Sequence, residues 1–254
     1  MDRSPAASSN GREPARAHPA VAAVVLAGGS GVRVGHGRNK AYLPLGGHTA
    51  VGLSLSTMAS VPGLRRLVLV VRAVDIDLAQ QTLDEELPRP PVPVELVVGG
   101  GSRHGSEEHA LRHLEAGIRA AALDLVLIHD AARPLCSSEL VDELVRAATA
   151  HGGAVPGLEA ADLAAVGPAG NLVPLPGRYV RIQTPQVFVA APLLQAYLRA
   201  AETGFEGTDT AACVERFSGL DVVHVAGEEQ NFKITYPHDL RTADEFVRRR
   251  DEQE

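Results

Sequence analysis

Residues 21–31 read Val-Ala-Ala-Val-Val-Leu-Ala-Gly-Gly-Ser-Gly, a short apolar run rich in valine that leads directly into glycines. A buried strand followed by glycines allows several backbone N–H groups to approach a ligand closely. The stretch therefore predicts the first strand of a sheet and a ligand-binding loop after it. A signal peptide is the alternative, because a charged segment precedes the run. The β-branched residues and the direct transition into glycines favour the strand.

Further along the chain, short apolar runs alternate with segments that have apolar residues at helical spacing. Strands are predicted at 21–27, 66–71, 94–98, 124–129, 153–158, 222–225 and 233–235. Helices are predicted at 49–60, 75–83, 106–119, 137–150, 192–202, 209–217 and from residue 237. Continuous apolar strands that alternate with helices are typical of a parallel sheet covered by helices. The predicted fold class is α/β, with a doubly wound and mostly parallel sheet.

Two segments depart from this alternation. Residues 1–20 are rich in Ala, Ser, Pro and Arg, and this composition predicts a disordered tail. Between Glu159 and Arg178, prolines and glycines leave no room for a regular core element, so a loop or an extended arm is expected. The predicted organisation is one domain over 21–250 that carries an arm at about 159–182.

Composition excludes several classes of protein. The chain has 254 residues, with 24 Lys plus Arg against 31 Asp plus Glu, a net charge of −7. Such a surface does not attract polyanions broadly, so nucleic acid is not an expected partner. No apolar run reaches the roughly 18 residues of a membrane span, so no membrane partner is expected. Two cysteines without a CxxC pattern exclude a disulfide scaffold, and a cytoplasmic location is expected.

The first glycine loop carries nearby positive charge. Arg33 and Lys40 follow Gly28, Gly29 and Gly31 within a few residues, and phosphate is the ligand that this combination favours. The spacing does not match a GxGxxG dinucleotide fingerprint or a Gly-Lys-[ST] Walker loop. The alternative is a plain glycine turn with charges on the surface.

Asp130 comes directly after a buried strand, where open α/β sheets place their ligands. A single carboxylate there can hold Mg²⁺ if phosphate oxygens and water complete the coordination. The alternative is that Asp130 caps the following turn and pairs with Arg133.

Two further segments are candidates for ligand binding. Gly99-Gly100-Gly101 follows the third strand and leads to Ser106 at a predicted helix start, so the backbone there can reach a flat ligand edge-on, or the segment is a flexible turn. Lys233 lies in an apolar run, where it is either a surface residue with a buried stem or a cation that points into a cleft. His109 and His113 have helical spacing but lack the Glu of HExxH, so they are expected to be solvated.

Six segments together resemble the 2-C-methyl-D-erythritol 4-phosphate cytidylyltransferase family, from Val21 to about Phe246. They are Ala27–Arg33 with Lys40, Gly100–Ser106, His129–Pro134, Gln183–Gln186 with Phe188, Thr208–Asp209, and Asn231–Thr235. The resemblance implies a nucleotidyltransferase fold of the Rossmann-like type, with CTP as a substrate and Mg²⁺ as the cofactor. It also implies a polyol phosphate as the acceptor, a role in isoprenoid synthesis, and a homodimer whose arms complete each other's sites.

The resemblance also implies roles for single residues. Arg33, Lys40 and Lys233 would neutralise the triphosphate and the transition state, and Asp130 would hold the metal. The nucleotide-binding residues that it implies are Ala27, Gly28, Gly29, Gly31, Gly100, Gly101, Arg103 and Ser106.

The sequence departs from the family pattern on the acceptor side. The family's Asp-Thr-x-Lys segment falls on Asp162, so that Leu163 stands at the Thr and Ala165 at the Lys. The remaining cations nearby are Arg178 and Arg181, of which Arg181 is expected to bind the acceptor phosphate, because it is nearer the matched Gln183–Gln186 segment. Two alternatives remain: another nucleotidyltransferase, of the molybdopterin guanylyl- or sugar-phosphate type, or a catalytically silent paralogue that binds nucleotide.

Overall fold

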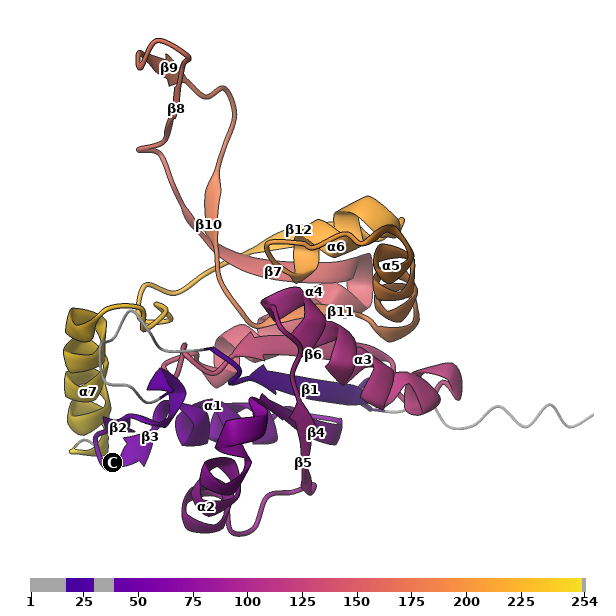
Figure 1. The fold of residues 1–254 in the computed structure, drawn as a ribbon, viewed down its shortest axis with the longest axis vertical. Helices are drawn as coiled ribbons and strands as arrows, with labels where there is room; N and C mark the ends of the chain where they lie inside the picture. Colours follow the sequence, from indigo (N-terminus) through magenta and orange to yellow (C-terminus); the bar gives the residue numbers. More distant parts are fainter. Residues whose placement is uncertain (1–16, 30–38, 253–254) are drawn as a thin grey trace, which may run out of the picture.

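The computed structural model describes residues 17–29 and 39–252. Its main strands are β1 (Val21–Leu26), β4 (Leu64–Val71), β5 (Val94–Val98), β6 (Leu125–Asp130), β7 (Gly152–Glu159), β10 (Val180–Ile182), β11 (Gln186–Val189) and β12 (Asp221–Ala226). They form one eight-stranded sheet in the order β10-β7-β11-β6-β1-β4-β5, and β12 pairs with β7 as well (Figure 1). Strands β6, β1, β4 and β5 are parallel, whereas β11 is antiparallel to both β6 and β7. The predicted α/β class with a mostly parallel sheet is confirmed.

Helices cover both faces of this sheet. They are α1 (Ala50–Ala59), α2 (Ile76–Glu86), α3 (Arg103–Arg119), α4 (Ser138–His151), α5 (Ala190–Thr203), α6 (Thr210–Phe217) and α7 (Pro237–Asp251). Because successive strand residues point to opposite faces, Val21, Ala23 and Val25 pack with α1, α2 and α4. Ala22 and Val24 pack with α3, α5 and α6. Among the described residues, no helix is both long and apolar enough to cross a membrane.

Polar side chains fix where several helices begin. Ser137 accepts a hydrogen bond from the backbone N–H of Leu140 at 3.1 Å and so caps α4. Ser102 accepts from the N–H of Gly105, so α3 begins at Arg103, three residues before the predicted start. Ser106 is consequently within the first turn of α3 and not its first residue.

The predicted strand at 233–235 is wrong. These residues pair with none of the described strands, and the N–H of Ile234 donates to the carbonyl of Ala132, in the turn after β6, at 2.8 Å. Ile234 is buried because it packs with Leu45, Ala243 and Val247, on the short hairpin of β2 (Pro44–Leu45) and β3 (His48–Thr49) and on α7. Its apolar character therefore reflects this small cluster and not a position in the sheet.

The segment between β7 and β10 extends away from the body of the molecule (Figure 1). Its tip is a hairpin of β8 (Ala164–Val166) and β9 (Leu172–Pro174), which pair with each other and not with the main sheet. At its base, β10 pairs with the end of β7, with Arg181 opposite Leu158. The predicted tail, by contrast, lies mostly outside the described residues.

Candidate active site

The turn after β1 lies against the first turn of α3. The N–H of Ala27 donates to the carbonyl of Val70, which keeps the chain in the sheet up to the glycines. A Cβ on Gly28 would lie 3.7 Å from the hydroxyl oxygen of Ser106. Gly28 and Ser106, two of the expected nucleotide-binding residues, are thus close together. Gly31 and Arg33 lie outside the described residues.

The glycines after β5 are explained in part by packing. A Cβ on Gly100 would come within 2.7 Å of the backbone carbon of Gly105, a distance that real Cβ atoms do not reach. Gly101 has no atom within 4 Å of such a Cβ and therefore faces open space. Close packing on α3 thus requires glycine at 100, while the open position at 101 is free to contact a ligand.

Lys40 is in η2 (Lys40–Tyr42), a short helical turn held near the end of β1 by its neighbour Asn39. The buried Asn39 amide donates to the carbonyl of Ala27 at 2.6 Å and to Asp75 at 2.9 Å. The Lys40 ammonium donates to the carbonyl of Ile234 at 2.5 Å. The structure therefore brings Lys40 to the segment that carries Lys233.

Asp130 ends β6 and lies between two cations. The Lys233 ammonium is 2.6 Å from Asp130 Oδ2, and Arg103 Nε is 3.3 Å from Oδ1. Burial alone would raise the pKa of Asp130, but the charges of Lys233 and Arg103 outweigh burial and hold it well below its usual range. The carboxylate is therefore ionised at neutral pH, as a metal ligand must be. Arg133 donates instead to the carbonyl of Asn231 at 2.7 Å, and the alternative Asp130–Arg133 pair is not among the ion pairs of the described residues.

Thr184 fixes the backbone of Asp130. Its hydroxyl accepts from the Asp130 N–H at 3.0 Å and is 3.2 Å from Nδ1 of His129. Burial lowers the pKa of His129 to about 4, so this imidazole is neutral, with Nε2 3.1 Å from the carbonyl of Arg133. The neutral tautomer with hydrogen on Nε2 satisfies both contacts. The Gln183–Gln186 motif thus supports the Asp130 motif directly, a link that sequence spacing does not reveal.

Glu107 is a buried residue that the sequence analysis did not select. It is fully buried and accepts hydrogen bonds from Arg103, Tyr197 and Thr210. The one signal in the sequence is its position four residues after Arg103, the spacing of an ion pair on a helix.

The two arm arginines do not join this cluster. Arg181 Nη2 lies 2.7 Å from Asp162 Oδ1, and Arg178 pairs with Glu159. Both pairs are exposed. Arg181 is in β10, whereas Arg178 precedes this strand.

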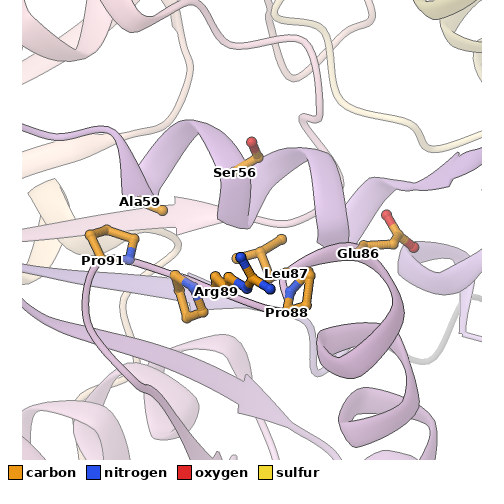
Figure 2. Close-up of a pocket in the computed structure, with 8 residues that line it drawn as sticks. Ser56, Ala59, Glu86, Leu87, Pro88, Arg89 and Pro91 are labelled. Atoms are coloured by element: carbon orange, nitrogen blue, oxygen red, sulfur yellow. The ribbon is translucent and has the colours of Figure 1, made fainter.

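Other side chains with metal-ligand chemistry are arranged differently. His113 pairs with Glu95 at 2.6 Å, and His109 contacts the carbonyl of Val98 at 2.9 Å. Over residues 17–29 and 39–252, no group of three or more His, Cys, Asp or Glu side chains could hold a metal ion. A pocket of about 280 Å³ lies between α1 and the connection from α2 to β5, and its lining, which includes Leu87 and Arg89, shares no residue with the candidate site (Figure 2).

A profile of the 2-C-methyl-D-erythritol 4-phosphate cytidylyltransferase family matches residues 21–249. The chain belongs to this family. The match covers the whole described domain, including the arm, and it confirms the resemblance drawn from the six motifs. This family is one of nucleotidyltransferases.

Known relatives of the chain are of two lengths. The chain is 37% identical over 229 residues to a bifunctional enzyme IspD/IspF of Rhizorhabdus wittichii, a match that covers 89% of this chain and 56% of that enzyme. It is 36% identical over 245 residues to the 2-C-methyl-D-erythritol 4-phosphate cytidylyltransferase of Thermobifida fusca, covering 93% and 96%. The chain thus spans about half the length of the bifunctional relatives.

A solved structure shares the fold. The 4-diphosphocytidyl-2C-methyl-D-erythritol synthase of Anaerococcus prevotii superposes with a TM-score of 0.78 at 25% identity, covering 90% of this chain and 96% of that one. The chain thus shares its fold with that synthase over nearly the whole of both chains.

Proposed function

We propose that this chain transfers CMP from CTP to 2-C-methyl-D-erythritol 4-phosphate or a similar polyol phosphate, in isoprenoid precursor synthesis. The observation that carries the proposal is the Asp130 carboxylate between Lys233 and Arg103, at the end of β6. The nearby turn at Gly28 and Ser106 supplies a place for a nucleotide. Family membership favours this reaction over the guanylyl- and sugar-phosphate alternatives.

In the reaction, an oxygen of the acceptor phosphate attacks the α-phosphorus of CTP in line. A new P–O bond forms as the bond to the bridging oxygen breaks, and pyrophosphate leaves with that electron pair. Lys40 and Lys233 would neutralise the charge that develops on the phosphates, as would Arg33. Catalysis of this kind is positioning plus charge neutralisation and needs no covalent intermediate.

The residues at the site fit a magnesium ion. Mg²⁺ commonly uses one or two carboxylates and takes its remaining ligands from substrate phosphates and water. Asp130 supplies one ionised carboxylate, and the triphosphate would supply the other charged oxygens. When bound, the ion would polarise the phosphate oxygens. Lys233 would then exchange its contact with Asp130 for one with phosphate.

Nucleotide and acceptor would occupy different parts of the chain. Backbone atoms at Ala27, Gly28 and Gly29, together with Gly31, Gly100, Gly101, Arg103 and Ser106, would bind CTP. Arg181 would bind the acceptor phosphate, since an Arg fork suits a phosphate dianion.

The arm would belong to a homodimer and complete the site of a second copy. Val166 and Leu172 at its tip are 72% and 74% exposed, which is apolar surface that a partner arm would cover. A cytoplasmic location is part of the proposal and accords with two cysteines that are free and buried.

A pyrophosphate-release assay tests the proposal. The full chain is mixed with CTP, Mg²⁺ and either 2-C-methyl-D-erythritol 4-phosphate or other polyol phosphates, and GTP, ATP and UTP replace CTP in parallel. We expect release with CTP and one of these acceptors. Release with another nucleotide alone would contradict the base assignment. Binding of CTP without release for every acceptor would indicate a silent paralogue.

A further inference from the structure

Three hydrogen-bond donors surround the carboxylate of Glu107. Burial raises the pKa of this carboxyl, while the charge of Arg103 and the hydrogen bonds from Thr210 and Tyr197 act in the opposite direction. Arg103 Nη1 donates to Oε1 at 2.5 Å, Thr210 donates to Oε1 at 2.6 Å, and Tyr197 donates to Oε2 at 2.6 Å. These donors come from α3, α6 and α5, so one buried carboxylate joins three helices. Burial of a charge is costly unless it is paired and hydrogen-bonded, and here both conditions hold.

Arg103 connects this carboxylate to the candidate metal ligand. Its Nη1 makes a short contact with Glu107, whereas its Nε is 3.3 Å from Asp130 Oδ1, slightly beyond the usual range for N–H···O bonds. The other oxygen of Asp130 accepts from Lys233. The guanidinium is therefore hydrogen-bonded more closely to Glu107 than to Asp130, although its charge still stabilises the Asp130 carboxylate.

Without Glu107, the same guanidinium would have a different preferred partner. An arginine beside a single carboxylate tends to form two parallel hydrogen bonds, one to each oxygen. Such a fork on Asp130 would occupy both oxygens, and a metal ion needs at least one of them. The loss of the negative charge of Glu107 would also make the site less favourable for a cation.

We propose that Glu107 is a positioning residue that holds the Arg103 guanidinium away from a bidentate pair with Asp130 and so keeps that carboxylate open to a divalent ion. This inference rests on the proposed function in assigning Asp130 to the metal. A purely structural role, in which Glu107 only ties α3 to α5 and α6, predicts changes in stability but none in metal affinity.

The test measures Mn²⁺ binding by electron paramagnetic resonance, at a CTP concentration that saturates each variant. Glu107→Gln keeps the size of the side chain and removes its charge. We expect its Mn²⁺ affinity to fall about 10–100-fold, the usual effect of losing a residue that supports a metal ligand. In an Arg103→Gln background, Glu107→Gln should cause no further loss, because Glu107 acts through Arg103.

Glu95→Gln is the matched control. Glu95 pairs with Arg66 on β5 and β4, and it lies three strands from β6. Like Glu107→Gln, this change takes the carboxylate partner away from an arginine, but it should leave Mn²⁺ affinity unchanged. Thermal unfolding of each variant separates loss of fold from loss of metal. If Glu107→Gln does not fold, Glu107→Asp carries the test, since it keeps the charge but shortens its reach and should weaken Mn²⁺ binding in the same direction.

Equal Mn²⁺ affinity in the wild type and Glu107→Gln would overturn the inference, as would an equal loss in the Arg103→Gln background. A wild-type chain that binds no Mn²⁺ would overturn it as well. Pyrophosphate release by the wild type is measured separately. A chain without turnover but with Mn²⁺ binding that depends on Glu107 would contradict the proposed function and leave the inference standing.

Discussion

The end of β6 and the arm both contain acid–base pairs, but the two regions hold them differently. Asp130 is 7% exposed, and its cations come from α3 and from the 231–235 segment, 27 and 103 residues away in sequence. On the arm, the side chains of Arg178 and Glu159 are 85% and 67% exposed, and each arm pair links residues 19 apart.

The difference bears on function. In the buried cluster, each charge is fixed by partners on other elements, so the geometry is set before a ligand arrives. Exposed pairs contribute little to stability and exchange their partners readily. A preorganised cluster is suited to binding the reacting phosphates. Exposed arm residues, which can change partners, are suited to binding an acceptor or a second subunit.

The largest expected effect is at the two lysines. Lys233→Ala and Lys40→Ala should each lower kcat by roughly 10²–10³, the usual cost of removing one preorganised charge from a developing oxyanion. The thermal unfolding temperature should change little, so the loss of turnover would not reflect loss of the fold. Near-wild-type kcat in either variant would show that the buried cluster does not hold the reacting phosphates.

On the arm, Arg181→Ala should act on the acceptor alone. Loss of a hydrogen bond to a charged group costs about 1.5–3 kcal/mol, so KM for the acceptor should rise at least tenfold, with little change in CTP binding. Initial rates at varied acceptor and saturating CTP measure this. If Arg178→Ala gives that result instead, the register of the arm is assigned wrongly. If neither does, the arm does not hold the acceptor phosphate.

Within the buried cluster, Thr184→Val tests the support beneath Asp130. The change leaves the Asp130 N–H buried without its acceptor, which should lower the free energy of unfolding by about 1–3 kcal/mol. Urea denaturation gives the value. Thr149→Val, which removes a hydroxyl bonded to a carbonyl in α4, is the control and should cost less. Equal losses in the two variants would mean that Thr184 has no special role.

The smallest effect is expected at the exposed pair on the arm. Glu159→Gln should change the free energy of unfolding by less than about 0.5 kcal/mol, since both side chains stay in solvent after the change. Denaturation at low and at high salt should give the same small difference in the free energy of unfolding between the variant and the wild type. A loss comparable with that of Thr184→Val would remove the contrast between the two regions.

The fold was largely predictable from local pattern. Apolar runs and turn residues predict the strands at 21–27 and 94–98 and the start of α7 at Pro237. These signals are local, because each depends on residues that are neighbours in the sequence. Strand β11 at Gln186–Val189 was not predicted. It is short and is inserted between β6 and β7, so its hydrogen bonds come entirely from distant residues.

The site was predictable as a set of motifs but not as a set of contacts. Asp130, Lys40 and Lys233 were singled out from the sequence. In the structure Lys233 pairs with Asp130, and Lys40 donates to the carbonyl of the next residue, Ile234. The contacts of Arg103 with Asp130 and of Thr184 with the Asp130 backbone depend on how α3 and the 183–186 segment pack. Glu107 could not be distinguished from a solvated helical residue, since Tyr197 and Thr210 are 90 and 103 residues away.

Lys40 and Lys233 are the only lysines in the sequence, and the structure brings both to the 233–234 segment. Reductive methylation with ¹³C-formaldehyde would therefore place side-chain NMR labels at these two ammonium groups alone, apart from the α-amine. Each resonance would report separately on one ammonium group as nucleotide, metal and acceptor are added. The chain thus carries its own pair of spectroscopic reporters, and neither needs an engineered residue.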